Sequence, residues 1–190
     1  MDCYIGEGGT FIDTANVYGR WNPGNLPLSE RMIGRWLSFH HLRDKVILAT
    51  KGAADNEGEK GKKRLSKQEI RQDLQDSLKN LRTDYIDLYL VHWPDPNVSM
   101  EETIGAVAQL KKEGKILHAG VSNFTKEQIE EAGKYCEIEA YQPQYSMLDG
   151  DNEAVIRWAA AQGMGIMSYG TLGGGILTGT YREVRTFGET

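Results

Sequence analysis

The sequence predicts an α/β fold of the (β/α)8 TIM-barrel type, incomplete, with about six βα units present. Apolar runs that read as strands alternate with amphipathic helical segments along the 190 residues, which is typical of parallel strands joined by helices. Polar residues follow several strands in succession, as at a barrel rim, where side chains from different strands converge. The alternative is an open doubly wound sheet. It would be favoured by a Gly-x-Gly-x-x-Gly turn after the first strand, which the sequence lacks.

Composition narrows the class of protein further. A net charge of −5 and a pI of about 5.4 argue against nucleic-acid or polybasic membrane partners. No apolar run approaches the roughly 20 residues of a spanning helix, and no secretory signal is visible. Cys3 and Cys136 fit neither a disulfide framework nor a metal site, and Cys136 reads as a buried residue at a helix end. We therefore expect one cytoplasmic domain over residues 1–190.

The first elements are a helix end, a strand and a second helix. Residues 1–5 read as the tail of a helix that stops at Gly8 and Gly9, and a strand follows over residues 10–13. A chain that opens in the last turns of a helix is expected to lack part of its barrel at the N-terminus. Ser29 is the expected N-cap of the next helix. Its inward face would carry Ile33, Trp36 and Leu37.

Capping boxes predict the start of three helices. In each box a hydroxyl residue precedes an acidic or amide residue by three positions. The boxes are Ser66–Glu69, Ser99–Glu102 and Thr125–Gln128. A fourth helix is expected over residues 152–162. The polar stretch from Gly52 to Arg64 has two readings, a solvated loop or a lid over a site.

The remaining strands are expected where short apolar runs end on a polar residue. They cover residues 45–51, 85–92, 117–122, 139–142 and 165–169. After the last of them the chain becomes glycine-rich, and no further element is expected. The glycines at 173–175 lack the Lys-Ser/Thr of a P-loop, so they are weak evidence for phosphate binding by themselves.

Four reactive side chains follow three of these strands. Asp13 ends the first strand, Tyr18 comes after the next turn, and Lys51 and His92 end the second and third strands. If the strands are parallel, the four side chains meet at one rim. Each has a structural reading too: a turn cap, a packed aromatic, a solvated strand end and a core histidine. The set in this order favours a shared site over four separate structural roles.

Such a site suits proton transfer to a carbonyl oxygen. A lysine cation near Tyr18 would favour the phenolate and lower the tyrosine pKa from about 10. Asp13 would hold Lys51 in place and keep it charged, and His92 would donate a hydrogen bond to the substrate. Any hydride would have to come from a cofactor. Metal ligation is not expected, because His40 and His41 are adjacent and no ligand spacing is clear.

Six motifs occur in order along nearly the whole chain. They are Asp13-x-Ala15-x-x-Tyr18-Gly19, Ala49-Thr50-Lys51, Leu90-Val91-His92-Trp93-Pro94, Val121-Ser122-Asn123-Phe124, Tyr141-Gln142-Pro143-Gln144-Tyr145-Ser146 and Ser168-Tyr169-Gly170-Thr171-Leu172-Gly173. As a set they resemble the aldo-keto reductases. The resemblance implies a (β/α)8 barrel that reduces aldehydes or ketones with NADPH.

The resemblance also implies roles for individual residues. Asp13, Tyr18, Lys51 and His92 take the positions of a catalytic tetrad, with Tyr18 as the general acid. The residues implied to bind the cofactor are Ser122, Asn123 and Gln142 at the nicotinamide carboxamide, Tyr169 stacked on its ring, and Gly170, Leu172 and Gly173 along the pyrophosphate.

The family's first strand and its last strand and helices are expected to be missing, with the basic segment that binds the adenosine 2'-phosphate. The cofactor is therefore NADPH by resemblance, with NADH as the alternative, and the substrate is an unspecified small carbonyl compound. Two other functions stay open: a non-catalytic cofactor-binding regulatory subunit, and an inactive fragment. Oligomeric state is not predicted.

Overall fold

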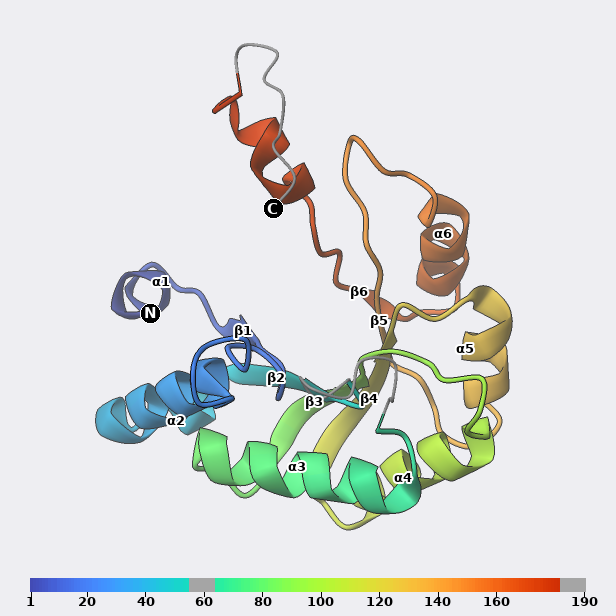
Figure 1. Cartoon of the computed structure of the whole chain (residues 1–190), viewed down its shortest axis with the longest axis horizontal. Coiled ribbons are helices and arrows are strands. Elements are labelled where there is room, and N and C mark those ends of the chain that lie inside the picture. Colours follow the sequence, from blue (N-terminus) through green and yellow to red (C-terminus); the bar gives the residue numbers. More distant parts are fainter. Residues whose placement is uncertain (55–63, 182–190) are drawn as a thin grey trace.

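The computed structural model describes residues 1–54 and 64–181. Within these ranges the strands form one six-stranded sheet in sequential order, and every neighbouring pair is parallel. The strands are β1 (Phe11–Asp13), β2 (Ile47–Gly52), β3 (Ile86–Val91), β4 (Ile116–Ser122), β5 (Ala140–Gln142) and β6 (Gly165–Ile166). Helices cover one side of the curved sheet (Figure 1). The predicted α/β fold with six strands is confirmed as a parallel half-barrel.

The helices follow the strands as the sequence predicts. They are α1 (Asp2–Gly6), α2 (Leu28–His40), α3 (Lys67–Leu81), α4 (Met100–Lys112), α5 (Lys126–Ala132) and α6 (Glu153–Ala161), with 3₁₀ turns η1 (Arg43–Lys45) and η2 (Gly173–Thr178). The capping boxes at Ser66 and Thr125 are complete, with both reciprocal hydrogen bonds formed. At Ser99 only the serine side accepts its bond, from the amide of Glu102.

Some sequence expectations were wrong in detail. Ser29 does not cap α2, because the helix begins at Leu28 with Pro27 as its N-cap, two residues earlier than expected. The Ser29 hydroxyl lies instead 2.8 Å from that of Thr14. The last strand stops at Ile166, and Tyr169 adds only an isolated bridge to Gln144. The glycine-rich end, where no element was expected, forms η2.

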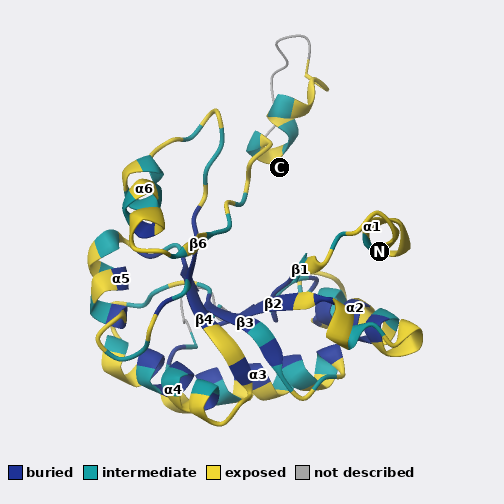
Figure 2. Ribbon diagram, turned by 180° about the vertical axis from the view of Figure 1, so that it is seen from behind, coloured by how far each residue is buried: buried dark blue, intermediate teal, exposed yellow. Residues whose placement is uncertain are grey.

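Two apolar clusters hold the sheet. The larger one lies between the sheet and its helices and joins residues such as Leu48, Ile70, Tyr89 and Ile104. The smaller one consists of Ala49, Leu88, Leu90 and Ala140, with Met167 packed against it. Figure 2 shows the central strands as the most continuously buried part of the molecule. Most of the folding energy from apolar burial therefore lies in the sheet–helix layer.

The remaining sequence expectations concern exposure. Cys136 is half-buried just beyond α5, and Cys3 is exposed. None of the helices in the described ranges has the length and apolar character that a bilayer crossing requires. The stretch read as a loop or lid, Gly52–Arg64, falls largely on residues 55–63, which lie outside the described residues.

Candidate active site

The centre of the site is the ammonium group of Lys51 near the carboxyl end of β2. Its side chain is fully buried. Its Nζ atom lies 2.9 and 2.8 Å from the two carboxylate oxygens of Asp13 and 2.8 Å from the carbonyl oxygen of Thr14. The hydroxyl of Tyr18 is 3.4 Å away. A buried cation needs such partners, because leaving water without them costs several kcal/mol.

The segment after β1 brings Asp13 and Tyr18 to this cation. The amide of Thr14 donates to Ala49, and the amide of Asn16 donates to the carbonyl of Lys51 at 2.9 Å, so the chain continues beside β2. At Gly19 the backbone turns with φ of 92°, and an added Cβ would lie 2.8 Å from Cβ of Leu28. Glycine permits both the positive φ and the close approach.

His92 enters from the neighbouring strand. Its amide donates to Gly52 at 3.0 Å, directly after the Gly52–Val91 register pair of β2 and β3. Its ring meets the Tyr18 ring edge-on, with centroids 5.9 Å apart and planes at 77°. The Nδ1 atom is buried without a hydrogen-bond partner in the described residues. The four strand-end residues predicted to meet are thus brought together.

The electrostatics of the site differ from the sequence expectation. Burial and the nearby Asp13 carboxylate raise the pKa of Tyr18, whereas a lowered pKa was expected from Lys51. Burial lowers the pKa of Lys51, although Asp13 acts in the opposite direction. Burial, and then the Lys51 charge, lower the pKa of His92 to about 4. At neutral pH the site therefore holds a neutral phenol and a neutral imidazole.

The residues matched to the nicotinamide carboxamide lie beside this group. Gln142 donates from Nε2 to Asp13 at 3.2 Å, which joins the end of β5 to the tetrad. The Ser122 hydroxyl donates to the Gln142 carbonyl at 2.8 Å. Asn123, with φ of 61°, donates from Nδ2 to the His92 carbonyl at 3.0 Å and to Ser122 at 3.1 Å. One hydrogen-bonded set therefore connects the ends of four strands, β1, β3, β4 and β5.

Tyr169 extends the set. Its hydroxyl donates to Oδ1 of Asn123 at 2.7 Å, and its side chain is half-buried. Beyond it, Gly170 and Gly173 have φ of 68° and 57°, and Leu172 is largely exposed. Within the described ranges, no hydrogen bond joins Gly170, Leu172 or Gly173 to Asp13, Tyr18, Lys51 or His92.

These donors and acceptors fit a nicotinamide cofactor. Gln142 keeps its Oε1 atom and one N–H free of partners among the described residues, which suits a carboxamide that both donates and accepts. The Tyr169 ring offers an aromatic surface beside it. At Gly174 and Gly175 an added Cβ would meet nothing within 4 Å, so this backbone leaves room for a phosphate to approach.

Sequence reasoning missed other contributors to the site. The Thr14 carbonyl that binds Lys51 gives no side-chain signal, because it is backbone. Trp21 and Trp93 are exposed by 64% and 42%, and their rings lie 6.4 Å from Tyr18 and 6.3 Å from His92. Trp21 lies three residues after Tyr18 and Trp93 directly follows His92, and this spacing is the signal that could have placed both rings beside the site.

The comparisons with known proteins agree with this geometry. The aldo/keto reductase family model matches residues 1–190. The chain is 38% identical to aldo-keto reductase YhdN of Bacillus subtilis over 184 residues, covering 96% of the chain and 54% of that relative. It is 33% identical to protein tas of Escherichia coli, covering 95% of the chain and 61% of that relative.

Solved structures give the same picture. An aldo-keto reductase from Bacillus halodurans in its holo form superimposes with a TM-score of 0.81 at 33% identity, over 99% of this chain and 60% of that one. A glycerol dehydrogenase from Gluconobacter oxydans gives 0.84 at 31% identity, over 97% and 56%. The chain spans about half the length of the curated relatives it matches. On the family model and the shared half-barrel together, this chain belongs to the aldo/keto reductase family.

Proposed function

We propose that the chain carries the site of an NADPH-dependent oxidoreductase that reduces an aldehyde or ketone to an alcohol. The observation that carries the proposal is the buried Lys51 ammonium, held by Asp13 and placed 3.4 Å from the Tyr18 hydroxyl with the His92 ring alongside. Family membership supports the same chemistry.

Tyr18 is the proposed general acid. Its raised pKa keeps the phenol protonated at neutral pH, so it has a proton to give. The proton passes to the carbonyl oxygen as a hydride reaches the carbonyl carbon, which leaves an alcohol and a phenolate. The Lys51 cation stabilises that phenolate by charge attraction, and this stabilisation arises only as the proton leaves.

His92 and Asp13 have supporting roles in the proposal. With its pKa near 4, His92 is neutral at pH 7 and retains one N–H that can donate to the carbonyl oxygen. Asp13 fixes Lys51 through both carboxylate oxygens. A displaced ammonium would stabilise the phenolate less, because charge attraction falls with distance.

The nicotinamide cofactor, when bound, supplies the hydride. We propose that Ser122, Asn123 and Gln142 hold its carboxamide, and that the Tyr169 ring packs on the nicotinamide. Gly170, Leu172 and Gly173 are proposed to run along the pyrophosphate. NADH remains the alternative to NADPH, since both share these parts. The substrate is proposed to be a small carbonyl compound.

The test is Tyr18→Phe in the 190-residue chain. We expect turnover on a panel of aldehydes to fall by about 10²–10⁴-fold, the usual contribution of a positioned acid. The affinity for the cofactor should change little. It is measured by the change in tryptophan fluorescence during an NADPH titration. Tyr135→Phe is the matched control, because that tyrosine lies near the end of α5 and its hydroxyl bonds only Glu131 among the described residues.

The outcomes separate the candidate functions. Equal turnover in Tyr18→Phe and the unaltered chain would reject Tyr18 as the acid. NADPH binding without turnover in the unaltered chain would favour a cofactor-binding regulatory subunit. Absence of both would leave a chain without a competent site.

A further inference from the structure

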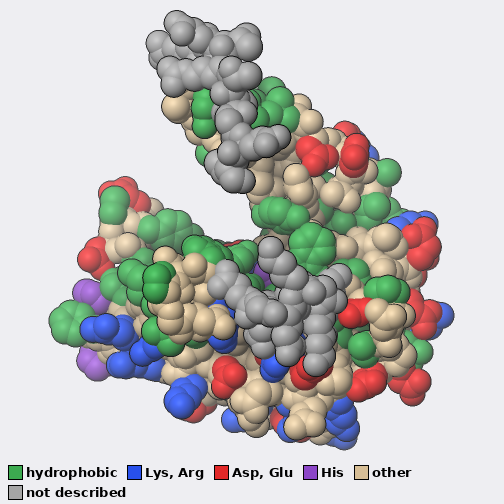
Figure 3. Space-filling view, viewed as in Figure 1, with side chains coloured by type: hydrophobic (Ala, Val, Ile, Leu, Met, Phe, Trp, Pro, Cys, Tyr) green, Lys and Arg blue, Asp and Glu red, His purple; other side chains and the backbone are tan. Residues whose placement is uncertain are grey.

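We propose that the groove between α2 and α3 is a second binding site, specific for small molecules that carry phosphate groups. The groove has a volume of 380 Å³ and is lined by Arg31 and Arg35 of α2 and by Lys79, Asn80 and Arg82 at the end of α3. It lies on the helical layer outside the sheet, away from the Tyr18 site. In Figure 3, Lys and Arg side chains gather over α2.

The cations are brought together by a close helix crossing. An added Cβ at Gly34 would lie 2.2 Å from the carbonyl oxygen of Asn80 and 2.6 Å from Cα of Leu81. The absence of a side chain at Gly34 therefore lets α2 rest directly on the end of α3. Arg35 follows this contact on one helix, and Arg82 follows it on the other, where φ of 54° ends α3. The juxtaposition is fixed by backbone packing.

The four cations have no acidic partners within residues 1–54 and 64–181. In the described part of the chain none of Arg31, Arg35, Lys79 and Arg82 forms an ion pair or a side-chain hydrogen bond, although the protein is acidic overall. Among the residues that the structure describes, no carboxylate lines the groove. Asp44 shares a neighbouring hollow with Arg82 but forms no ion pair with it. The buried carboxylate of Glu30, next to Arg31 in the chain, accepts hydrogen bonds from Asn80 and Thr50.

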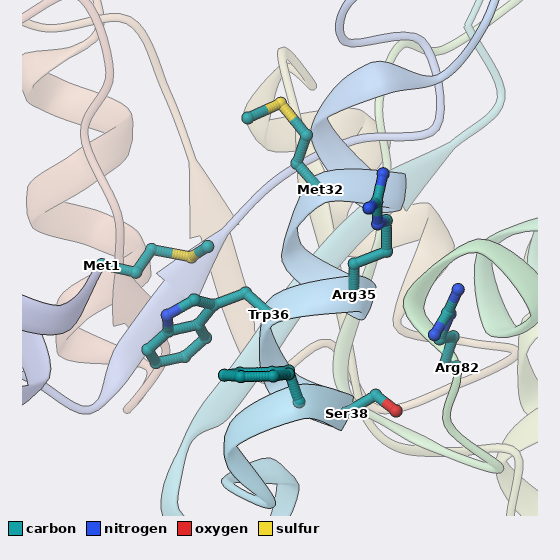
Figure 4. Close-up of a pocket in the computed structure, with 7 residues that line it drawn as sticks. Met1, Met32, Arg35, Trp36, Ser38 and Arg82 are labelled. Carbon is teal, nitrogen blue, oxygen red and sulfur yellow. The ribbon is translucent and has the colours of Figure 1, made fainter.

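The clustering of these four cations lowers the stability of the fold. Arg31 and Arg35 stand four residues apart on α2, where like charges repel. The C-terminal end of α3 stabilises nearby cations, which accounts in part for Lys79 and Arg82. Arg31 and Arg35 on α2 have no such stabilisation. Figure 4 shows Arg35 and Arg82 near Met1 and Trp36, and all four residues line a neighbouring hollow, so the two arginines border both hollows. A bound multivalent anion would offset the repulsion.

Phosphate groups match this lining best. Guanidinium groups bind phosphate oxygens through paired N–H donors, and three of the four cations here are arginines. Asn80 also lines the groove, and its side-chain Nδ2 already donates to Glu30. The volume falls within the range of small-molecule sites and exceeds what one phosphate fills. The ligand class is therefore a phosphate ester or polyphosphate of a small molecule or of a lipid headgroup.

The test uses inorganic tripolyphosphate with the whole chain in phosphate-free buffer. Isothermal titration calorimetry should give saturable binding of one ligand per chain that weakens as NaCl is raised. The double variant Arg35→Gln/Arg82→Gln should weaken binding at least about 10-fold, because each lost contact is a charge-assisted bond. Both side chains are exposed, so the fold and the Tyr18 site should be unaffected.

The matched control is Lys112→Gln/Lys115→Gln, which removes the same charge from the exposed end of α4 and the residues after it. It should change the affinity less than 2-fold. No saturable binding, or an equal loss in both double variants, would overturn the proposal. Vesicles of phosphatidylcholine with phosphatidylinositol 4-phosphate identify the source: binding to them indicates a lipid headgroup, and binding to tripolyphosphate alone indicates a free phosphorylated compound. None of these outcomes depends on reductase activity.

Discussion

At the scale of single residues, the site is governed by one buried charge. Lys51 is fully buried, yet its cation is compensated by two carboxylate contacts and a carbonyl. Breaking such a pair by removing one partner is typically far more costly than the pair is stabilising. The same cation depresses the pKa of His92 in addition to the effect of burial. The chemistry proposed for Tyr18 and the stability of the fold therefore rest on the same group.

His92 makes the stability of the protein depend on pH. Its pKa falls from 6.5 to about 4 on folding, so the unfolded chain binds more protons between these values. Stability is then complete above pH 6.5 and is lost as the pH falls toward 4. The loss has an upper limit of about 3 kcal/mol, reduced by the solvent that reaches the partly exposed ring.

The corresponding variant is His92→Gln, which cannot titrate. Urea unfolding at pH 7.0 and pH 4.5 should show a smaller loss of unfolding free energy in this variant than in the unaltered chain. His41→Gln removes an exposed histidine and serves as the control. An equal change in the two variants would contradict the assignment to His92.

The sequence was sufficient to predict which residues meet, and insufficient to predict their ionisation. Asp13, Lys51 and His92 follow or end strands, and parallel strands bring their carboxyl ends to one edge. The pKa of Tyr18 went the other way because it depends on burial and on the distance to Asp13, which no local pattern encodes. The contact of the Thr14 carbonyl with Lys51 could not be predicted either, because a backbone group carries no signal in the sequence.

At the scale of elements, local capping signals were reliable where the cap is local. Ser66 and Thr125 bond residues three positions away, so the pattern specifies the contact completely. Ser29 has a similar local sequence pattern, but its hydroxyl forms a hydrogen bond with that of Thr14, which follows β1. The length of β6 is likewise set by a contact outside the segment, because the strand extends only as far as it pairs with β5. Tertiary contacts thus decided the outcome for Ser29 and for β6.

The α2–α3 crossing gives a prediction about packing. Gly34→Ala would place a methyl group 2.2 Å from the Asn80 carbonyl oxygen. The oxygen belongs to the backbone and the position of Cβ is fixed by the backbone, so neither atom can rotate away. We expect a loss of about 2–3 kcal/mol in unfolding free energy, typical of overpacking. Thermal or urea unfolding measures it.

Gly105→Ala is the control for helix propensity. Gly105 lies inside α4, and an added Cβ there meets nothing within 4 Å. Alanine should stabilise this position by about 0.5–1 kcal/mol. If both substitutions changed stability in the same direction, the close crossing at Gly34 would be contradicted.

At the scale of the whole molecule, the sheet is open. In the described ranges β1 and β6 each pair with one neighbour only, so each leaves one edge unpaired. The two termini of the described chain lie on the same side of the molecule as these edges (Figure 1). The helical layer supplies a core that does not require closure, because the larger apolar cluster lies between sheet and helices. The site can therefore assemble on a half-barrel.

An open parallel sheet with apolar groups near its edge is a template for association. Phe11 and Ile47 are register partners on β1 and β2, are exposed by 37% and 46%, and line a shared hollow of 190 Å³. We expect the 190-residue chain to self-associate at micromolar concentration, as sedimentation velocity would reveal. Phe11→Lys/Ile47→Lys should shift it toward the monomer, since Asp87 and Glu139 line the same hollow and would favour the new cations.

The control for this prediction is Met147→Lys/Ile176→Lys. Both residues are exposed apolar side chains outside the strands, by 91% and 53%, so the control adds the same charge away from the β1 edge. It should leave the association largely unchanged. If both pairs reduced self-association equally, net charge rather than the open edge would be its cause. A chain that is monomeric at every concentration would show that the unpaired strands are protected from one another without any closing partner.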